Sequence, residues 1–109
     1  MIEKDLLSVL TDYKCFTERP PKAPKQWVLL ERIGQSCEEH GILYRSRFAV
    51  QSYADSLLNA AELDEQVKNT LLSTEHHNIS SIKLNSSTNF TDPETKEYRY
   101  QSVYDIVHY

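Results

Sequence analysis

Apolar side chains follow a helical period over three stretches of the chain. At positions 50, 53, 54, 57, 58 and 61 they have the spacing i, i+3, i+4, i+7, i+8, i+11 that is typical of one helix face. Shorter stripes with the same period cover residues 2–13 and 25–40. The pattern therefore predicts three helices, the first of which ends before the prolines at positions 20, 21 and 24.

The pattern does not decide the secondary structure of two short stretches. Asp64 either caps a fourth short helix or lies within a longer third helix that bends. Residues 42–47 fit a strand, a turn or the start of a helix equally well.

Near the end of the chain the period changes to two. Apolar and polar positions alternate over residues 82–90 and again over 98–106, and Asp92 and Pro93 fit the first two positions of a type I turn between them. This predicts an antiparallel hairpin. Because two strands alone are barely stable, we expect the hairpin to pack on the helices.

The expected fold class is α+β: three or four helices followed by a C-terminal antiparallel β-hairpin packed on them. A chain of 109 residues forms a single domain by this interpretation, with a helical part over about 2–74 and the hairpin over about 81–107. We expect the core to contain the apolar side chains on the helical stripes: Leu6, Leu10, Leu30, Ile33, Leu57 and Leu58.

Composition argues against cofactor chemistry. Gly34 and Gly41 are the only glycines, so no glycine-rich loop is available to surround a phosphate, and we expect no cofactor. No long apolar run occurs, and acidic residues stand where a signal peptide carries basic ones, so the sequence predicts a soluble, cytoplasmic protein that does not associate with membranes. In that compartment Cys15 and Cys37 are expected as reduced thiols.

Metal binding and catalysis are poorly supported. Cys37 and His40 share one face of the predicted helix, and His76 with His77 would complete a set of four zinc ligands, but the paired-cysteine spacing of structural zinc sites is missing. The same Cys37 and His40 lack a third orienting group and an oxyanion hole. We therefore predict no metal ligand and no catalytic residue, and a non-enzymatic protein.

Charge is unevenly distributed although the net value is only −4. Residues 14–47 contain seven cations and four anions, which allows a helix-turn-helix-like nucleic-acid-binding regulator that uses the basic 19–47 segment, with Gly41 at the turn. Against this alternative, Arg47 would then lie between the helices, where an unpaired guanidinium is costly.

The tyrosines near the C-terminus favour a protein partner. Tyrosine combines a large apolar area with a polar tip and suits either a core or an interface. One face and one edge of the hairpin should stay free for strand addition. The predicted partner-binding residues are Tyr98, Arg99, Tyr100 and Tyr109, with Lys22 and Lys25 as a second contact. By analogy, this predicts a small protein-binding module, an inhibitor or immunity-type protein that covers a target's functional surface.

Overall fold

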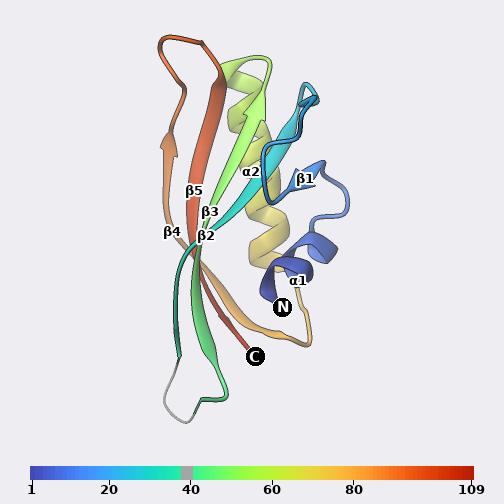
Figure 1. Cartoon of the computed structure of the whole chain (residues 1–109), viewed down its shortest axis with the longest axis vertical. Coiled ribbons are helices and arrows are strands. Elements are labelled where there is room, and N and C mark those ends of the chain that lie inside the picture. The colour runs from blue at the N-terminus through green and yellow to red at the C-terminus, as the bar shows by residue number, and fades with distance from the viewer. Residues whose placement is uncertain (38–40) are drawn as a thin grey trace.

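Five strands form one mixed sheet, and two helices cover one of its faces (Figure 1). The computed structural model describes residues 1–37 and 41–109. In chain order its elements are α1 (Ile2–Val9), β1 (Cys15–Phe16), β2 (Trp27–Cys37), β3 (Tyr44–Ala54), α2 (Leu57–Ser73), β4 (Ile79–Asn89) and β5 (Tyr98–His108). The strand order is β1-β2-β3-β5-β4, in which β1 is parallel to β2 and every other pair is antiparallel.

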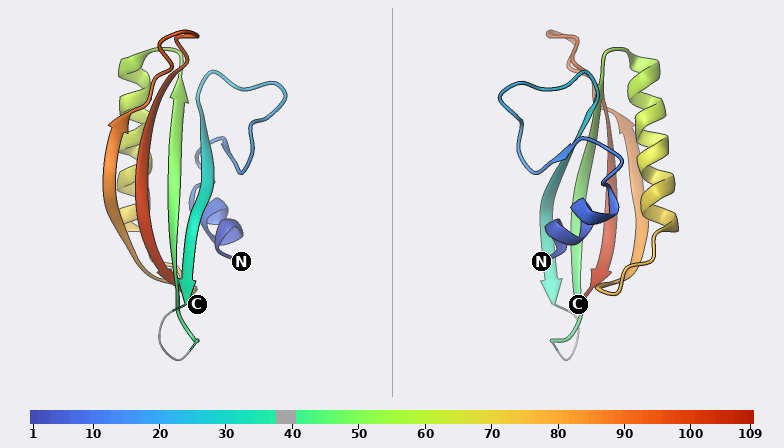
Figure 2. Two further views of the ribbon diagram at one scale, coloured as in Figure 1. Left: turned by 60° about the vertical axis from the view of Figure 1, so that its left-hand side comes forward. Right: turned by 90° about the vertical axis from the view of Figure 1, so that its right-hand side faces the viewer.

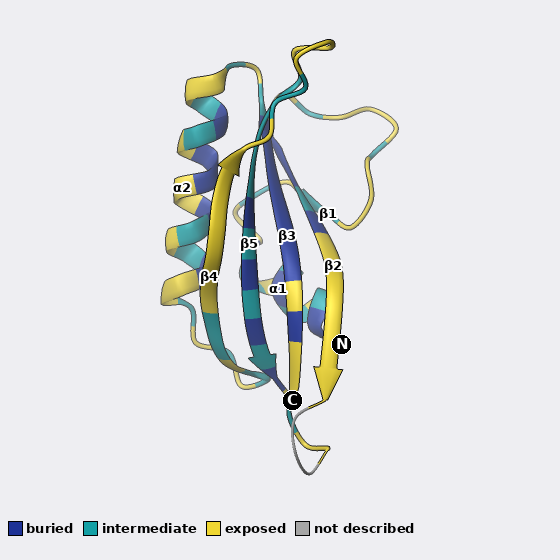
Figure 3. Ribbon diagram, turned by 90° about the vertical axis from the view of Figure 1, so that its left-hand side faces the viewer, coloured by how far each residue is buried: buried dark blue, intermediate teal, exposed yellow. Residues whose placement is uncertain are grey.

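Both helices lie on the same side of the sheet, as the two views in Figure 2 show. Ile2, Leu6 and Leu10 of the N-terminal segment and the apolar stripe of α2 enclose the core together with alternate residues of β2, β3 and β5. Phe48 lies opposite Tyr104 at the centre of this layer, and both are fully buried. No helix among the described residues covers the other face of the sheet, which Figure 3 presents to the viewer.

The predicted fold class is wrong. Residues 27–37 and 44–54 are long strands, not helices, so the described residues form two helices and a five-stranded sheet in place of three or four helices with a C-terminal hairpin. The last two strands are antiparallel neighbours, but β5 also pairs with β3 along its whole length and is an interior strand. The helical part over 2–74 therefore does not exist as a unit.

Burial on both faces explains this error. Residues 48–53 are buried without interruption, because one set packs under the helices and the other set is shielded on the uncovered face. A strand that is buried on both sides shows a continuous apolar run in place of alternation, and such a run imitates a helical stripe. The β-branched and aromatic residues of these segments favour the extended state.

Helix α2 begins later than the apolar spacing predicts. Ser56 caps it, because the Ser56 hydroxyl accepts a hydrogen bond from the amide of Asn59 at 3.1 Å. Leu57 and Leu58 consequently fall in the exposed first turn, and Ile33 is exposed at a bulge in β2. These three expected core residues lie outside the core. Leu6, Leu10 and Leu30 are buried as predicted.

Candidate protein-binding surface

Strand β4 forms one edge of the sheet. It pairs with β5 on one side only, and from Ser81 to Asn89 no described residue makes a backbone hydrogen bond to its outer side. Lys83 is the single charged residue among its eleven. Edge strands usually carry several charges that prevent pairing with another chain. This edge has instead two register shifts, between Ile79 and Ser81 and between Leu84 and Ser86.

The hydrogen-bond pattern shows which amides of β4 point outward. The Phe90 amide donates to the Arg99 carbonyl at 2.9 Å, so it points toward β5. Inward and outward amides alternate along an antiparallel strand, and the register is regular from Ser86 to Asn89. The amides of Asn89 and Ser87 therefore point away from the sheet, where an added strand could accept their hydrogen bonds.

Apolar side chains flank this edge on both faces. Leu84 lies opposite Tyr104 on the helix side and is 37% exposed, whereas Phe90 follows the strand opposite Arg99 on the uncovered face and is 45% exposed. A strand that pairs with β4 would cover both side chains. The edge thus offers apolar contact as well as backbone hydrogen bonds.

Lys83 makes no ion pair with any described residue. Asp105 lies opposite it on β5, but the Asp105 carboxylate accepts a hydrogen bond from Arg47 Nε at 2.8 Å. This bond, with a weaker contribution from Asn85, lowers the pKa of Asp105. Lys83 therefore leaves an unneutralised positive charge on the edge.

A buried carboxylate fixes β4 and β5 to α2. Asp64 is 4% exposed and accepts hydrogen bonds from Ser102 of β5 at 2.6 Å and from Ser87 of β4 at 3.1 Å. Lys68 Nζ lies 3.9 Å from the same carboxylate. Sequence reasoning placed Asp64 at a possible cap and missed this role. An acid within the apolar stripe of α2, which holds Ala60, Leu63, Val67 and Leu71, was the available signal.

The structure distributes the six predicted partner-binding residues over several surfaces. Tyr98 and Tyr100 lie on the helix side of β5 by alternation, and Arg99 lies on the uncovered face. Tyr109 follows the other end of β5, roughly 30 Å along the strand at about 3.3 Å per residue. Lys22 and Lys25 are exposed in the loop before β2, near the opposite edge of the sheet from β4 (Figure 1).

The described elements bear on the helix-turn-helix hypothesis and on part of the metal hypothesis. A helix-turn-helix over the basic segment would need helices where β2 and β3 lie. Cys37 ends β2, and His40 lies outside the described residues. Within the described ranges 1–37 and 41–109, no three His, Cys, Asp or Glu side chains come together in a group that could hold a metal ion.

One pair of residues resembles a nucleophile with its base. A hydrogen bond of 2.7 Å joins the Ser46 hydroxyl to Nε2 of His108, and the Gln35 amide donates to the same hydroxyl at 2.9 Å. Ser46 is fully buried, however, so its hydroxyl cannot reach a substrate. The pair links β3 to β5, and Gln35 extends the link to β2. Nothing in the sequence indicates it, because 62 residues separate the two side chains.

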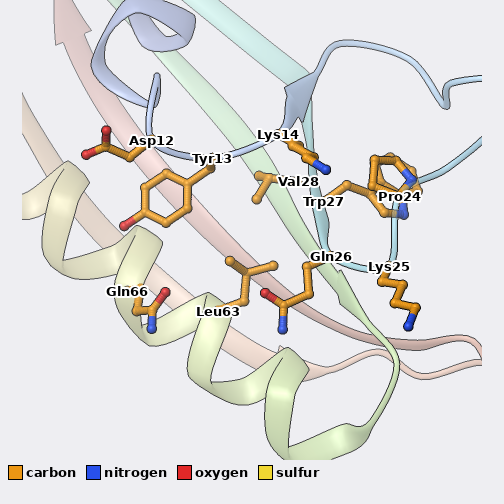
Figure 4. A pocket seen from close by; sticks show the side chains of 10 residues that line it. All are labelled: Asp12, Tyr13, Lys14, Pro24, Lys25, Gln26, Trp27, Val28, Leu63 and Gln66. Atoms are coloured by element: carbon orange, nitrogen blue, oxygen red, sulfur yellow. The ribbon is translucent and has the colours of Figure 1, made fainter.

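A cleft of about 520 Å³ lies between α2 and the segments that precede β1 and β2 (Figure 4). Val28 and Leu63 give it an apolar floor, and its rim is polar. Asp12 and Lys25 stand at opposite ends of the cleft and point away from each other (Figure 4). Asp12 and Lys25 therefore do not form a converging pair that could orient a substrate.

No protein-family model matches the chain, and the curated proteins include no significant relative. The described helices include none with the length and apolar character required to cross a bilayer.

Proposed function

We propose that this chain is a small, non-enzymatic protein-binding module that accepts an extended segment of another protein along the outer edge of β4. The observation that carries the proposal is an eleven-residue edge strand with a single charged side chain and an unpaired outer side from Ser81 onward. By covering that segment of its target, the module would act as an inhibitor or immunity-type protein.

Backbone pairing supports this mode of binding. An added strand forms hydrogen bonds with the outward amides of Ser87 and Asn89, and such bonds provide affinity whatever the partner's sequence. Asp64 holds β4 in place through Ser87, so the edge is preorganised and the ordering cost falls mainly on the partner.

The side chains beside the edge define the chemistry of the partner. Its segment should alternate, with an apolar residue over Leu84 on one face and another over Phe90 on the opposite face. An Asp or Glu beside Lys83 would neutralise the unpaired charge. Lys83 on β4 and Arg99 beside Phe90 are too few cations to attract a phosphate backbone strongly, which favours a protein over a nucleic acid.

The test uses peptides of twelve random residues displayed on phage and selected on the wild-type chain. The strongest binder is synthesised with a fluorophore and titrated by anisotropy against wild type and against a variant that carries both Ser86→Lys and Thr88→Lys. Both positions are exposed on β4 and face the uncovered side. The added charges should make pairing unfavourable and weaken binding at least about tenfold.

The matched control carries Ser8→Lys and Thr11→Lys, which add the same charge at exposed positions on and after α1. It should bind as wild type does. Equal affinity of the β4 variant and wild type would contradict the proposal, and so would a selection that enriches no peptide at all. Selected peptides should also show apolar alternation with an acidic residue.

A further inference from the structure

The uncovered face of the sheet carries a pair of stacked rings that an arginine contacts. Trp27 of β2 and Tyr53 of β3 are register partners, and their rings lie 4.1 Å apart and almost parallel, at 4°. Cζ of Arg19 lies 5.3 Å from the Trp27 ring centroid and 5.4 Å from that of Tyr53. Arg19 Nη2 also donates a hydrogen bond to Glu97 Oε1 at 2.6 Å.

These contacts suit a guanidinium group, which can lie against aromatic side chains while its N–H groups donate to a carboxylate. Because Arg19 Cζ is almost equidistant from the two parallel rings, the guanidinium lies at the edge of the ring stack. Trp27 and Tyr53 belong to long paired strands, and Glu97 directly precedes β5, so the sheet itself positions the aromatic and acidic parts of the site. The rings are only 3% exposed although no described helix covers this face.

The arginine that fills the site comes from a loosely attached loop. Among the described residues of the loop 17–26, Arg19 is the one whose side chain forms a hydrogen bond or ion pair. Its side chain is 49% exposed, and its neighbours Thr17, Glu18 and Pro21 are exposed as well. A space of about 390 Å³ separates this loop from Leu7 of α1. Arg19 can therefore leave the rings without disturbing the core.

We propose that Trp27, Tyr53 and Glu97 form a binding site for an arginine side chain of a partner protein, and that Arg19 fills this site in the free chain. Arg99 Nη1 already donates a hydrogen bond to the Tyr53 hydroxyl at 2.9 Å, and the Glu97 carboxylate, which Arg19 contacts in the free chain, is the group that favours a second cationic side chain as the occupant. Displacement of Arg19 also releases the loop 17–26. The site includes no residue of β4 and does not depend on strand addition there, although Arg99 contacts both Tyr53 and Phe90.

The test follows the fluorescence of Trp27, the only tryptophan of the chain, during titration with N-acetyl-arginine methylamide. In Arg19→Met the site is vacant, so the signal should saturate in the millimolar range. In wild type the tethered Arg19 competes at an effective concentration of order millimolar, similar to the dissociation constant, which should weaken binding at least about twofold. Lys22→Met, in the same loop, is the matched control and should behave as wild type does.

Two comparisons identify the chemistry of the site. The neutral citrulline derivative should give no saturable change with Arg19→Met, and adding Glu97→Gln to that variant should weaken arginine binding at least about tenfold. Circular dichroism verifies the fold, and Arg19→Gln replaces Arg19→Met if the latter unfolds. A linear response, equal responses to arginine and citrulline, or unfolding of both Arg19 variants would overturn the proposal.

Discussion

The bond between Asp64 and Ser102 should contribute measurably to stability, because it joins α2 to the strands that present the proposed binding edge. Asp64→Ala removes two hydrogen bonds to a buried carboxylate, from Ser102 and Ser87. Hydrogen bonds to charged groups contribute about 1.5 to 3 kcal/mol each. Relief of the carboxylate's desolvation offsets part of this loss. We expect the free energy of unfolding to fall by about 2 to 4 kcal/mol.

A double-mutant cycle isolates the bond itself. The free energies of unfolding of Asp64→Ala, Ser102→Ala and the double variant are measured by urea denaturation, followed through Trp27 fluorescence and circular dichroism. The two substitutions should couple by about 1.5 to 3 kcal/mol. Glu62→Ala, at an exposed position of α2, is the control and should change stability by less than about 0.5 kcal/mol. Additivity of Asp64→Ala and Ser102→Ala within about 0.5 kcal/mol would refute this account of the carboxylate.

Two further outcomes follow from burial. Leu71→Ala should lower the free energy of unfolding by about 2 to 5 kcal/mol, because Leu71 lies in the core. Leu57→Ala, at the exposed start of α2, should lower it far less. Urea denaturation of both variants measures the two losses, and similar values would contradict the packing. Burial raises the pKa of the Cys15 thiol to about 12, so at pH 8 iodoacetamide should modify the exposed Cys37 well before Cys15. Peptide mass mapping over time measures the order of modification. The reverse order would contradict the burial of Cys15.

The local patterns of the sequence predict the elements at the two ends of the chain better than those in the middle. The alternation over residues 82–90 and 98–106 predicts two strands that the structure contains, and Leu6 and Leu10 identify the buried side of the N-terminal helix. The middle fails because β3 is buried on both faces and shows no alternation. Ser56 caps α2 and so separates this helix from β3, but the apolar pattern places Ser56 inside the predicted third helix.

The candidate surfaces depend on long-range pairing that one sequence does not reveal. A free edge on the last two strands follows from the hairpin pattern, but its location on β4 depends on β5 pairing with β3. The prediction assigns Tyr98, Arg99 and Tyr100 to one surface because they are neighbours in the sequence. Alternation along β5 places the two tyrosines on one face of the sheet and Arg99 on the other. The contact of Arg19 with Glu97 spans 78 residues and leaves no local signal.

Amide hydrogen exchange tests the central claim about the β4 edge most directly. Exchange is measured by NMR on the wild-type chain with and without a saturating amount of the strongest selected peptide. Strand addition predicts that the outward amides of Ser87 and Asn89 exchange at least about tenfold more slowly in the complex, whereas amides in residues 31–37, the part of β2 beyond its pairing with β1, do not change. Unchanged exchange at Ser87 and Asn89, or protection confined to residues 31–37, would contradict the proposed binding edge.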